Sequence, residues 1–295
     1  MSLTEIFGKT IAAKVLKNPY YVPKFIGCSS LGMCPRKVVM MFDKNIERRE
    51  YSEEKILGEQ RQFRTSKRIE QDYANVYMKK GIMFAYNAWI TEWLPKGCAG
   101  QFDFLLRRDG LWELIEFKAP HPNVINFSDS LPKPYHIMQA EAYVYALHEM
   151  GIECDRYCVM NVPSGGTAMP VECWRDVKDI EALCKRSKNE FFKLLKAKKI
   201  YRETGELPPI IERELALNKA PKPKKETKIK IVKEVKLVSG WQCNEDYCPF
   251  SGVSCEPDTG TNKVASILYD GTIEIRKGYE EMEDKIKEFV SSETK

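Results

Sequence analysis

Residues 101–118 read QFDFLLRRDGLWELIEFK and carry the clearest signal for the fold of this chain. Two apolar runs flank Asp109-Gly110, a dipeptide that favours a tight hairpin turn because both residues tolerate a positive φ. If Asp109 and Gly110 form a two-residue loop, Asp103 on the first strand lies directly opposite Glu116 on the second. The sequence therefore predicts a β-hairpin that sets two carboxylates side by side.

Two opposed carboxylates in an otherwise apolar hairpin require a compensating cation. Opposed residues have Cβ atoms roughly 5 Å apart, a distance at which like charges repel each other. A divalent metal ion would supply the missing charge, with Lys118 beside it, because Lys118 lies two residues beyond Glu116 on the same face. The other interpretation is an edge hairpin with one solvated face, where these charges cost nothing.

The composition is that of an ordinary soluble globular protein. The chain has 295 residues, of which 43% are hydrophobic and 30% charged, enough for one large domain or two small ones. It contains no run of about 18 apolar residues, and its N-terminus lacks the pattern of a signal peptide. We therefore expect a cytoplasmic protein without membrane contact. The net charge of +5 permits a polyanionic partner without requiring one.

A long helix is predicted over residues 52–80, ahead of the hairpin. It lacks proline and carries apolar residues at helical spacing, among them Ile69 and Tyr73. Glu70 follows Ile69 at the edge of this apolar stripe. Glu70 is either a surface glutamate or a carboxylate that points from the helix towards the charged face of the hairpin.

A second helix is predicted over residues 134–150, after the hairpin. Pro134 occupies a tolerated first-turn position and Gly151 follows the end. Gln139 and Tyr143 fall on one stripe of this helix, four residues apart. Gln139 lies on the side expected to be buried, where its amide is either satisfied by the neighbouring backbone or has a role in a site.

The remaining elements are predicted from shorter patterns. Strands are expected at residues 82–93, 154–163 and 169–173, and a lysine-rich helix with a solvated face at residues 176–201. Residues 218–240 are rich in lysine and contain two prolines, which predicts an extended linker or arm. A small hairpin at residues 266–275 and a charged helix are expected to complete the chain.

The ten cysteines of this chain point to a reducing compartment rather than to a disulfide framework. Three of them, Cys243, Cys248 and Cys255, lie within a short turn-rich segment at the density of metal ligands. A tetrahedral thiolate site needs a fourth ligand, which Cys34 or Cys28 could provide. Sulfur ligands alone do not separate zinc from an iron–sulfur cluster, and unliganded thiols in a loop are the alternative.

Taken together, these residues resemble the PD-(D/E)XK nucleases of the RecB-like group. The likeness rests on Asp103, on Glu116-Phe117-Lys118 and on Gln139-x-x-x-Tyr143. The cysteines, one before this core and three after it, resemble the iron–sulfur members, which include AddB-type helicase–nucleases, CRISPR-associated exonucleases and phage enzymes. Cys34-Pro-Arg matches the motif that supplies the first cluster ligand there.

The resemblance implies an α/β fold with a restriction-endonuclease-like core, a mixed central sheet flanked by helices. A cysteine-rich cluster is expected to join the N- and C-terminal segments. The implied domain limits are an N-terminal segment at 1–51, the nuclease core at 52–217, the arm at 218–240, the cysteine segment at 241–256, and a terminal hairpin and helix at 257–295.

The resemblance also implies the site. Asp103, Glu116, the Phe117 carbonyl and Glu70 would hold Mg²⁺ or Mn²⁺, with Lys118, Gln139 and Tyr143 completing the catalytic group. Glu70 takes the place of the helix histidine found in many relatives, since Phe63-x-x-Ser66-x-x-x-Glu70 resembles the phage pattern with serine for glycine. Cys34, Cys243, Cys248 and Cys255 would hold a 4Fe–4S cluster, with zinc as the alternative.

The implied activity is exonucleolytic hydrolysis of single-stranded DNA or DNA ends in recombination, repair or replication. A recombination or replication protein is then a candidate partner, in a bacterial cytoplasm or in the host cytoplasm of a phage. The alternatives are a non-catalytic DNA-binding subunit of a helicase–nuclease complex and a CRISPR-adaptation nuclease. The intact Asp103, Glu116 and Lys118 argue against a non-catalytic subunit.

Overall fold

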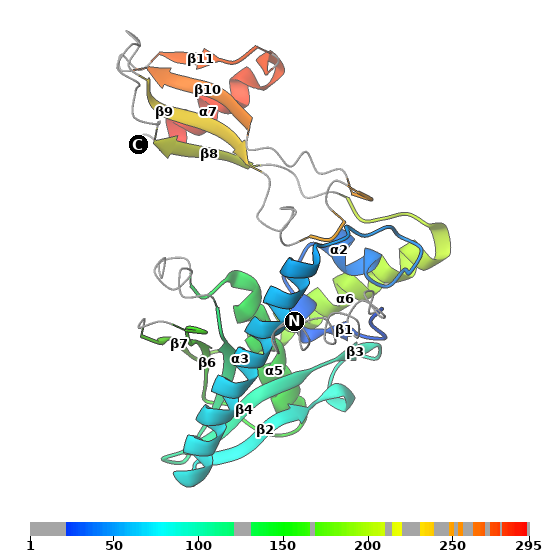
Figure 1. Ribbon diagram of the computed structural model, residues 1–295, viewed down its shortest axis with the longest axis vertical. Helices are drawn as coiled ribbons and strands as arrows, with labels where there is room; N and C mark the ends of the chain where they lie inside the picture. The colour runs from blue at the N-terminus through cyan, green and yellow to red at the C-terminus, as the bar shows by residue number, and fades with distance from the viewer. Residues whose placement is uncertain are drawn as a thin grey trace, which may run out of the picture. The chain divides into compact units, whose positions relative to one another are not determined.

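The computed structural model describes residues 22–120, 131–165, 169–209, 214–219, 231–238, 248–250, 253–255, 262–268, 272–277 and 279–293 (Figure 1). The chain divides into two compact units. The larger unit comprises Met1–Asn45 and Glu50–Pro208, and the smaller unit comprises Ile46–Arg49 and Pro209–Lys295. Each unit is described by itself. In the described parts of both, no helix is long and apolar enough to cross a membrane.

A five-stranded mixed sheet in the order β2-β4-β5-β6-β7 forms the centre of the larger unit. Strands β5 and β6 run parallel, whereas the other neighbouring pairs run antiparallel. The five strands are β2 (Met83–Trp89), β4 (Gln101–Arg108), β5 (Leu111–Lys118), β6 (Arg156–Asn161) and β7 (Val171–Asp176). Two short strands, β1 (Ile26–Gly27) and β3 (Cys98–Ala99), pair in parallel as a separate sheet.

The predicted hairpin is confirmed as β4 and β5. Arg108 pairs with Leu111, which leaves Asp109 and Gly110 as the two loop residues. Their φ angles are 54° and 86°, as a turn with two left-handed central residues requires. Since β4 and β5 occupy the second and third positions of the sheet, the hairpin is not at an edge. The interpretation as an edge hairpin with a solvated face is therefore wrong.

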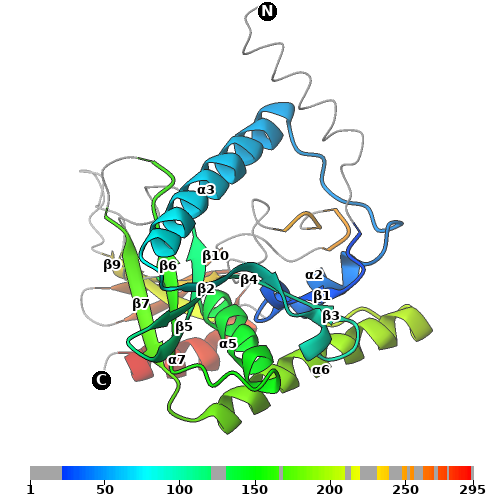
Figure 2. The same ribbon diagram turned by 90° about the horizontal axis from the view of Figure 1, so that it is seen from below.

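Helices cover both faces of this sheet (Figure 2). Helix α3 (Glu53–Lys79) packs on the face that carries Phe104, Ile115 and Phe117. Helices α5 (Pro134–Glu149) and α6 (Ile180–Thr204) belong to the core of the opposite face, which includes Phe102, Leu105 and Leu114. A short helix, α2 (Pro35–Met40), and 3-10 turns at Cys28–Ser30 and Thr91–Trp93 complete the larger unit. The predicted mixed sheet flanked by helices is thus observed.

Caps explain where the two predicted site helices begin and end. The Ser52 side chain accepts the Lys55 backbone N–H at 3.3 Å and starts α3. Gly81, with a φ of 67°, follows the end of α3 in the left-handed conformation that glycine adopts without strain. Pro134 is the first residue of α5, and Gly151 has a φ of 80° just beyond it.

Two predicted boundaries in the larger unit are wrong. The strand expected at residues 82–93 ends at Trp89, because the Ile90 N–H turns to the Gly100 carbonyl and Thr91–Trp93 form a 3-10 turn. The helix expected from residue 176 begins at Ile180, where Asp179 accepts the Ala182 N–H at 2.9 Å as the N-cap. Asp176 instead pairs with Arg156 at the end of β7.

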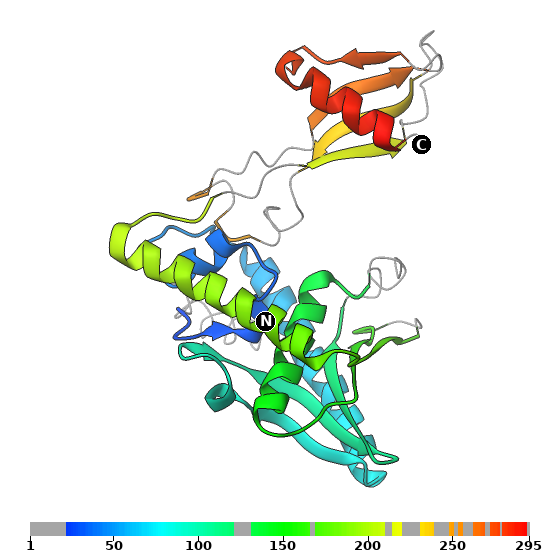
Figure 3. The same ribbon diagram turned by 180° about the vertical axis from the view of Figure 1, so that it is seen from behind.

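The smaller unit contains a four-stranded antiparallel sheet in the order β11-β10-β9-β8. Helix α7 (Glu283–Glu293) lies across one face of this sheet (Figure 3). Ile286 and Val290 of α7 pack with Val235 and Ala265 of the sheet. The strands are β8 (Glu214–Lys219), β9 (Ile231–Val238), β10 (Asn262–Leu268) and β11 (Ile273–Ile275), and a 3-10 turn at Glu280–Met282 precedes the helix.

The prediction of an extended arm over residues 218–240 is wrong where the structure describes this stretch. Residues 231–238 form β9, which pairs with β8 on one side and β10 on the other. Four of the eight residues along Ile231–Val238 are Ile or Val, and Val235 is fully buried in the core of the smaller unit. β-branched residues are enriched in strands, so the lysine content of this stretch misled the prediction.

Candidate active site

Asp103 sits where the two hairpin strands stop pairing through their backbones. The last paired residues on this side of the β4–β5 ladder are Phe104 and Ile115. One step further, the Phe117 N–H donates to the Asp103 Oδ2 at 2.7 Å, so the carboxylate takes the place of a backbone acceptor. This bond fixes Asp103 at the position next to Glu116 that the two-residue turn predicts.

Glu116 and Lys118 form a nearly buried ion pair on β5. The Lys118 Nζ lies 2.5 Å from the Glu116 Oε1. Glu116 is 2% exposed, whereas the Lys118 side chain is 23% exposed and reaches the surface. The other oxygen of Glu116, Oε2, is buried and has no hydrogen-bond partner among the described residues. One carboxylate oxygen is therefore available to a further ligand.

Two successive hydrogen bonds connect Lys118 to helix α5. The Lys118 Nζ donates to the Gln139 Oε1 at 3.0 Å, and the Gln139 Nε2 donates to the Tyr143 hydroxyl at 2.8 Å. Gln139 is 7% exposed and Tyr143 3% exposed, so neither bond competes with bulk water. The structure thus brings Lys118, Gln139 and Tyr143 together.

Glu70 approaches the same group from helix α3. It is 4% exposed and therefore not the surface glutamate of the alternative interpretation. The Lys67 Nζ lies 2.7 Å from its Oε2, and the Asn87 Nδ2 donates to its Oε1 at 3.0 Å. The charge of Glu70 raises the pKa of both Asp103 and Glu116, after the larger effect of burial. Three carboxylates therefore share one electrostatic environment.

The negative charges of this group are not balanced within it. Burial raises the pKa of Asp103 well above its usual value, and Glu116 and Glu70 raise it further. Burial likewise raises the pKa of Glu116, although Lys118 opposes this shift. Burial lowers the pKa of Lys118, but Glu116 and Asp103 outweigh it, so the pKa is raised and the ammonium stays protonated.

A hard divalent cation fits this site. Carboxylate oxygens are the ligands that Mg²⁺ prefers, and it commonly needs only one or two of them from the protein. The excess of carboxylates over ammonium groups favours such an ion, whereas the unpartnered Glu116 Oε2 does not by itself, because the Oε2 of Glu113 is unpartnered as well. In the described part of the chain, no three His, Cys, Asp or Glu side chains are arranged to hold a metal as they stand. The roles of Asp103, Glu116, Glu70 and the Phe117 carbonyl as metal ligands therefore stay predictions.

Sequence reasoning missed two polar residues around the site, Asn87 and Asn161, whereas His136 lies on the predicted stripe of Gln139 and Tyr143. Asn87 holds Glu70 and adopts a φ of 49°, which is unusual in a strand. Asn161 is fully buried at the position of β6 that pairs with Lys118. His136 is held neutral, because burial first and then Lys118 and Lys133 lower its pKa to about 3. The one sequence signal for these residues was Asn161, a polar residue at the end of the apolar run of β6.

Three of the four cysteines of the predicted cluster lie among the described residues. Cys34 belongs to the larger unit and is 7% exposed, whereas Cys248 and Cys255 belong to the smaller unit. Cys243 lies outside the described residues. Cys28 is buried, and a Cβ placed at Gly100 would approach its Sγ to 2.5 Å and the Tyr143 ring to 3.1 Å. Cys28 therefore packs in the core, and the four-cysteine cluster stays a prediction.

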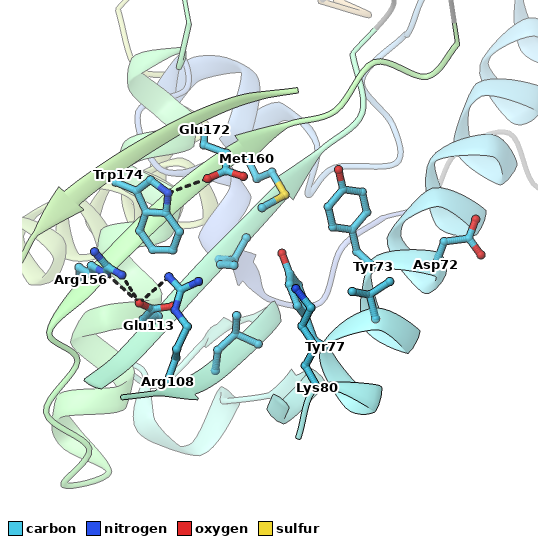
Figure 4. A pocket seen from close by; sticks show the side chains of 13 residues that line it. Asp72, Tyr73, Tyr77, Lys80, Arg108, Glu113, Arg156, Met160, Glu172 and Trp174 are labelled. Atoms are coloured by element: carbon cyan, nitrogen blue, oxygen red, sulfur yellow. Dashed lines mark hydrogen bonds and ion pairs between the residues drawn. The ribbon is translucent and has the colours of Figure 1, made fainter. Parts of the chain in front are cut away.

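A separate cavity of about 510 Å³ opens on the α3 face of the same hairpin (Figure 4). At its base, Glu113 is fully buried and accepts hydrogen bonds from Arg108 and Arg156. Side chains of β5 alternate between faces, so Glu113 and Glu116 point to opposite sides of the sheet. This cavity therefore belongs to a different environment from Asp103, Glu116 and Lys118.

Comparisons with known proteins give a weak likeness. No family model matches the sequence, and no curated protein matches it. The crystal structure of an alkaline exonuclease from Laribacter hongkongensis aligns with a TM-score of 0.40 and 14% identity, over 61% of this chain and 90% of that chain. The same exonuclease in complex with dAMP aligns with a TM-score of 0.35 and 16% identity, over 66% and 96%.

A protein named SSO0001 aligns with a TM-score of 0.39 and 13% identity, over 87% of this chain and 97% of that chain. TM-scores and identities this low support no functional conclusion by themselves. The function must be argued from the residues of the site.

Proposed function

We propose that this protein is a metal-dependent deoxyribonuclease, most specifically an exonuclease that hydrolyses single-stranded DNA or DNA ends. The observation that carries the proposal is the group of buried Glu116 with half-buried Asp103 and Lys118 at the point where β4 and β5 separate. Its surplus negative charge, beside a lysine that reaches the surface, is suited to a divalent cation and a phosphodiester.

Asp103 and Glu116 would hold Mg²⁺ or Mn²⁺, with Glu70 and the Phe117 carbonyl as further ligands. When bound, such an ion supplies Lewis-acid polarisation of the phosphodiester and makes a water molecule more acidic. The contribution of the protein is to keep two carboxylates fixed and dehydrated: the Phe117 N–H orients Asp103, and the strand backbone orients Glu116.

Lys118 has a raised pKa and stays protonated at neutral pH, so it acts as a hydrogen-bond donor and a charge. It would orient the attacking water and stabilise the negative charge that develops on the phosphate. Gln139 limits the positions of the ammonium by accepting one of its hydrogens, and Tyr143 in turn fixes Gln139. Gln139 and Tyr143 are thus positioning residues.

The proposal includes a structural 4Fe–4S cluster on Cys34, Cys243, Cys248 and Cys255, with zinc as the alternative. It is supported by the low exposure of Cys34, Cys248 and Cys255, at 7%, 6% and 8%, and by the resemblance of the cysteine pattern to the iron–sulfur nucleases. DNA is the proposed substrate, and a recombination, repair or replication reaction is the proposed setting.

The test is digestion of DNA labelled separately at its 5′ and 3′ ends, single- and double-stranded, in Mg²⁺, Mn²⁺ or EDTA. We expect metal-dependent loss of one end label before the other. Lys118→Ala should lower the rate by about 10²- to 10³-fold, the usual effect of losing one donor to a developing anion. DNA binding without cleavage under either metal, or full activity in Lys118→Ala, would overturn the proposal.

A further inference from the structure

A second cavity of the larger unit shares a wall with the candidate active site. Its volume is about 450 Å³, and Gln139 and Tyr143 line it. The same Gln139 accepts a hydrogen bond from the Lys118 Nζ at 3.0 Å. Cavities of this size hold small organic molecules or single groups of a larger ligand. A substrate bound at Lys118 is therefore adjacent to a space that one of its own groups could fill.

Helix α5 connects this cavity to the face that carries the candidate metal-binding carboxylates, because Gln139 and Tyr143 belong to α5, which packs in the core of that face. Gln101 also lines the cavity and lies two residues before Asp103 on β4, about 7 Å away along the strand. Trp89, also in the lining, pairs with Gln101 across the β2–β4 ladder. The cavity thus continues the active-site surface from Asp103 towards the edge strand β2.

Two large aromatic side chains in the lining are exposed to solvent. Phe25 is 47% exposed and Trp89 is 70% exposed. The lining also includes Gly100, where a Cβ would approach the Cys28 Sγ to 2.5 Å. A side chain at Gly100 would therefore clash with the core. An open space bordered by accessible rings accepts a flat apolar group.

The flat apolar group that accompanies a phosphodiester is a nucleobase. Every base has a π-face, and proteins that bind single-stranded DNA stack bases on aromatic side chains in this way. Bases in a duplex are already stacked, so a base is available to Trp89 and Phe25 only in a single strand or a frayed end. The aromatic rings therefore select among DNA substrates.

We propose that this cavity binds one unstacked base of the DNA strand whose phosphodiester lies at Asp103 and Glu116. Trp89 and Phe25 stack on the base, and Gln101 is in reach of its polar edge. This inference rests on the proposed nuclease function, because that function supplies the ligand. It adds that the substrate is a single-stranded or frayed end, and that an intact base beside the cut is required for tight binding.

The test measures binding of a fluorescein-labelled single-stranded oligonucleotide to the full chain in EDTA, so that cleavage does not interfere. The oligonucleotide is compared with copies that lack the base at the 5′-terminal positions, at the 3′-terminal positions, or at both. We expect base removal at one end to weaken binding by about tenfold, the scale of one base–aromatic stack. Trp89→Ala should weaken binding of the intact oligonucleotide by a similar factor and lose its sensitivity to base removal.

Phe84→Ala is the matched control, since Phe84 lies on the same strand and is 61% exposed but is not part of the cavity lining. It should behave like the wild type, and circular dichroism melting should show that both variants fold. Equal binding of intact and abasic DNA by the wild type, or equal base sensitivity in Trp89→Ala, would overturn the proposal. Parallel reactions with Mg²⁺ distinguish the two proposals. Base-dependent binding without cleavage would overturn only the proposed nuclease function. Cleavage without base-dependent binding would overturn only the proposed base-binding cavity.

Discussion

Strand β5 buries two glutamates three residues apart, and their surroundings differ in kind. Glu113, fully buried on the α3 side, shares its Oε1 between Arg108 and Arg156. Glu116, 2% exposed on the α5 side, lies next to Asp103 and has Lys118 as its cation. The first carboxylate therefore has two cations, whereas the second shares one cation with another carboxylate.

This difference in cation number distinguishes Glu113, a structural charge, from Glu116, a candidate functional charge. Two arginines balance the charge of Glu113 within the protein, although its Oε2, like the Oε2 of Glu116, has no hydrogen-bond partner among the described residues. Breaking these pairs leaves charges without partners. A buried carboxylate pair with too few cations raises the free energy of the folded state until a ligand supplies positive charge. The hairpin therefore carries a structural ion pair on one face and a candidate metal site on the other.

The largest expected effect on stability comes from removing Glu113. Glu113→Gln should lower the free energy of unfolding by roughly 2–3 kcal/mol, slightly less than usual for a broken buried pair because Arg108 and Arg156 stay partly solvated. Glu116→Gln in metal-free buffer should change it by less than about 1 kcal/mol, since relief of the repulsion from Asp103 offsets the lost ion pair with Lys118. Urea denaturation in EDTA measures both.

The two variants have the same chemistry at neighbouring positions of one strand, so each controls for the other. Equal losses of stability would mean that both glutamates are structural, and the comparison between the faces would fail.

A smaller effect on the free energy of unfolding is expected from His136, which burial and the nearby Lys118 keep neutral. Burial, with Lys118 and Lys133, lowers its pKa to about 3 in the folded chain, against about 6.5 when unfolded. Below pH 6.5 the His136 side chain binds a proton in the unfolded chain but not in the folded chain, so its contribution to stability falls as the pH falls and is flat above 6.5. Between pH 7.5 and 5 the loss should be about 1–2 kcal/mol.

Denaturation curves at several pH values measure this slope, and His136→Gln should remove it. His148→Gln is the matched control, because His148 is exposed near the end of the same helix. If His136→Gln kept the full slope, the environment of Lys118 would be less positive and less buried than the structure indicates.

Local signals in the sequence were enough to predict the central features of the larger unit. Asp109-Gly110 fixed the hairpin register, which placed Asp103 beside Glu116 through geometry that needs no tertiary information. The helical spacing of Gln139 and Tyr143 likewise predicted their shared stripe, and the structure decides between the two interpretations of Glu70, because its side chain is buried.

The residues that were missed depend on contacts between distant parts of the chain. Asn87 matters because it donates to Glu70 on another element, and Asn161 because β6 pairs in parallel with β5. Neither relation can be read from local periodicity. The lysines of β9 misled the prediction because lysine content was weighed above the β-branched residues of the same stretch, of which Val235 is a core residue.

The central claim is that the surplus negative charge at Glu116 serves a divalent cation. Its most direct test is the melting temperature of the full chain as Mg²⁺ or Mn²⁺ is added, for the wild type, Glu116→Gln and Glu113→Gln, since a ligand that binds the folded state stabilises it. We predict that the melting temperature rises with metal in the wild type and in Glu113→Gln but not in Glu116→Gln. An equal rise in all three proteins, or no rise in the wild type, would contradict the claim.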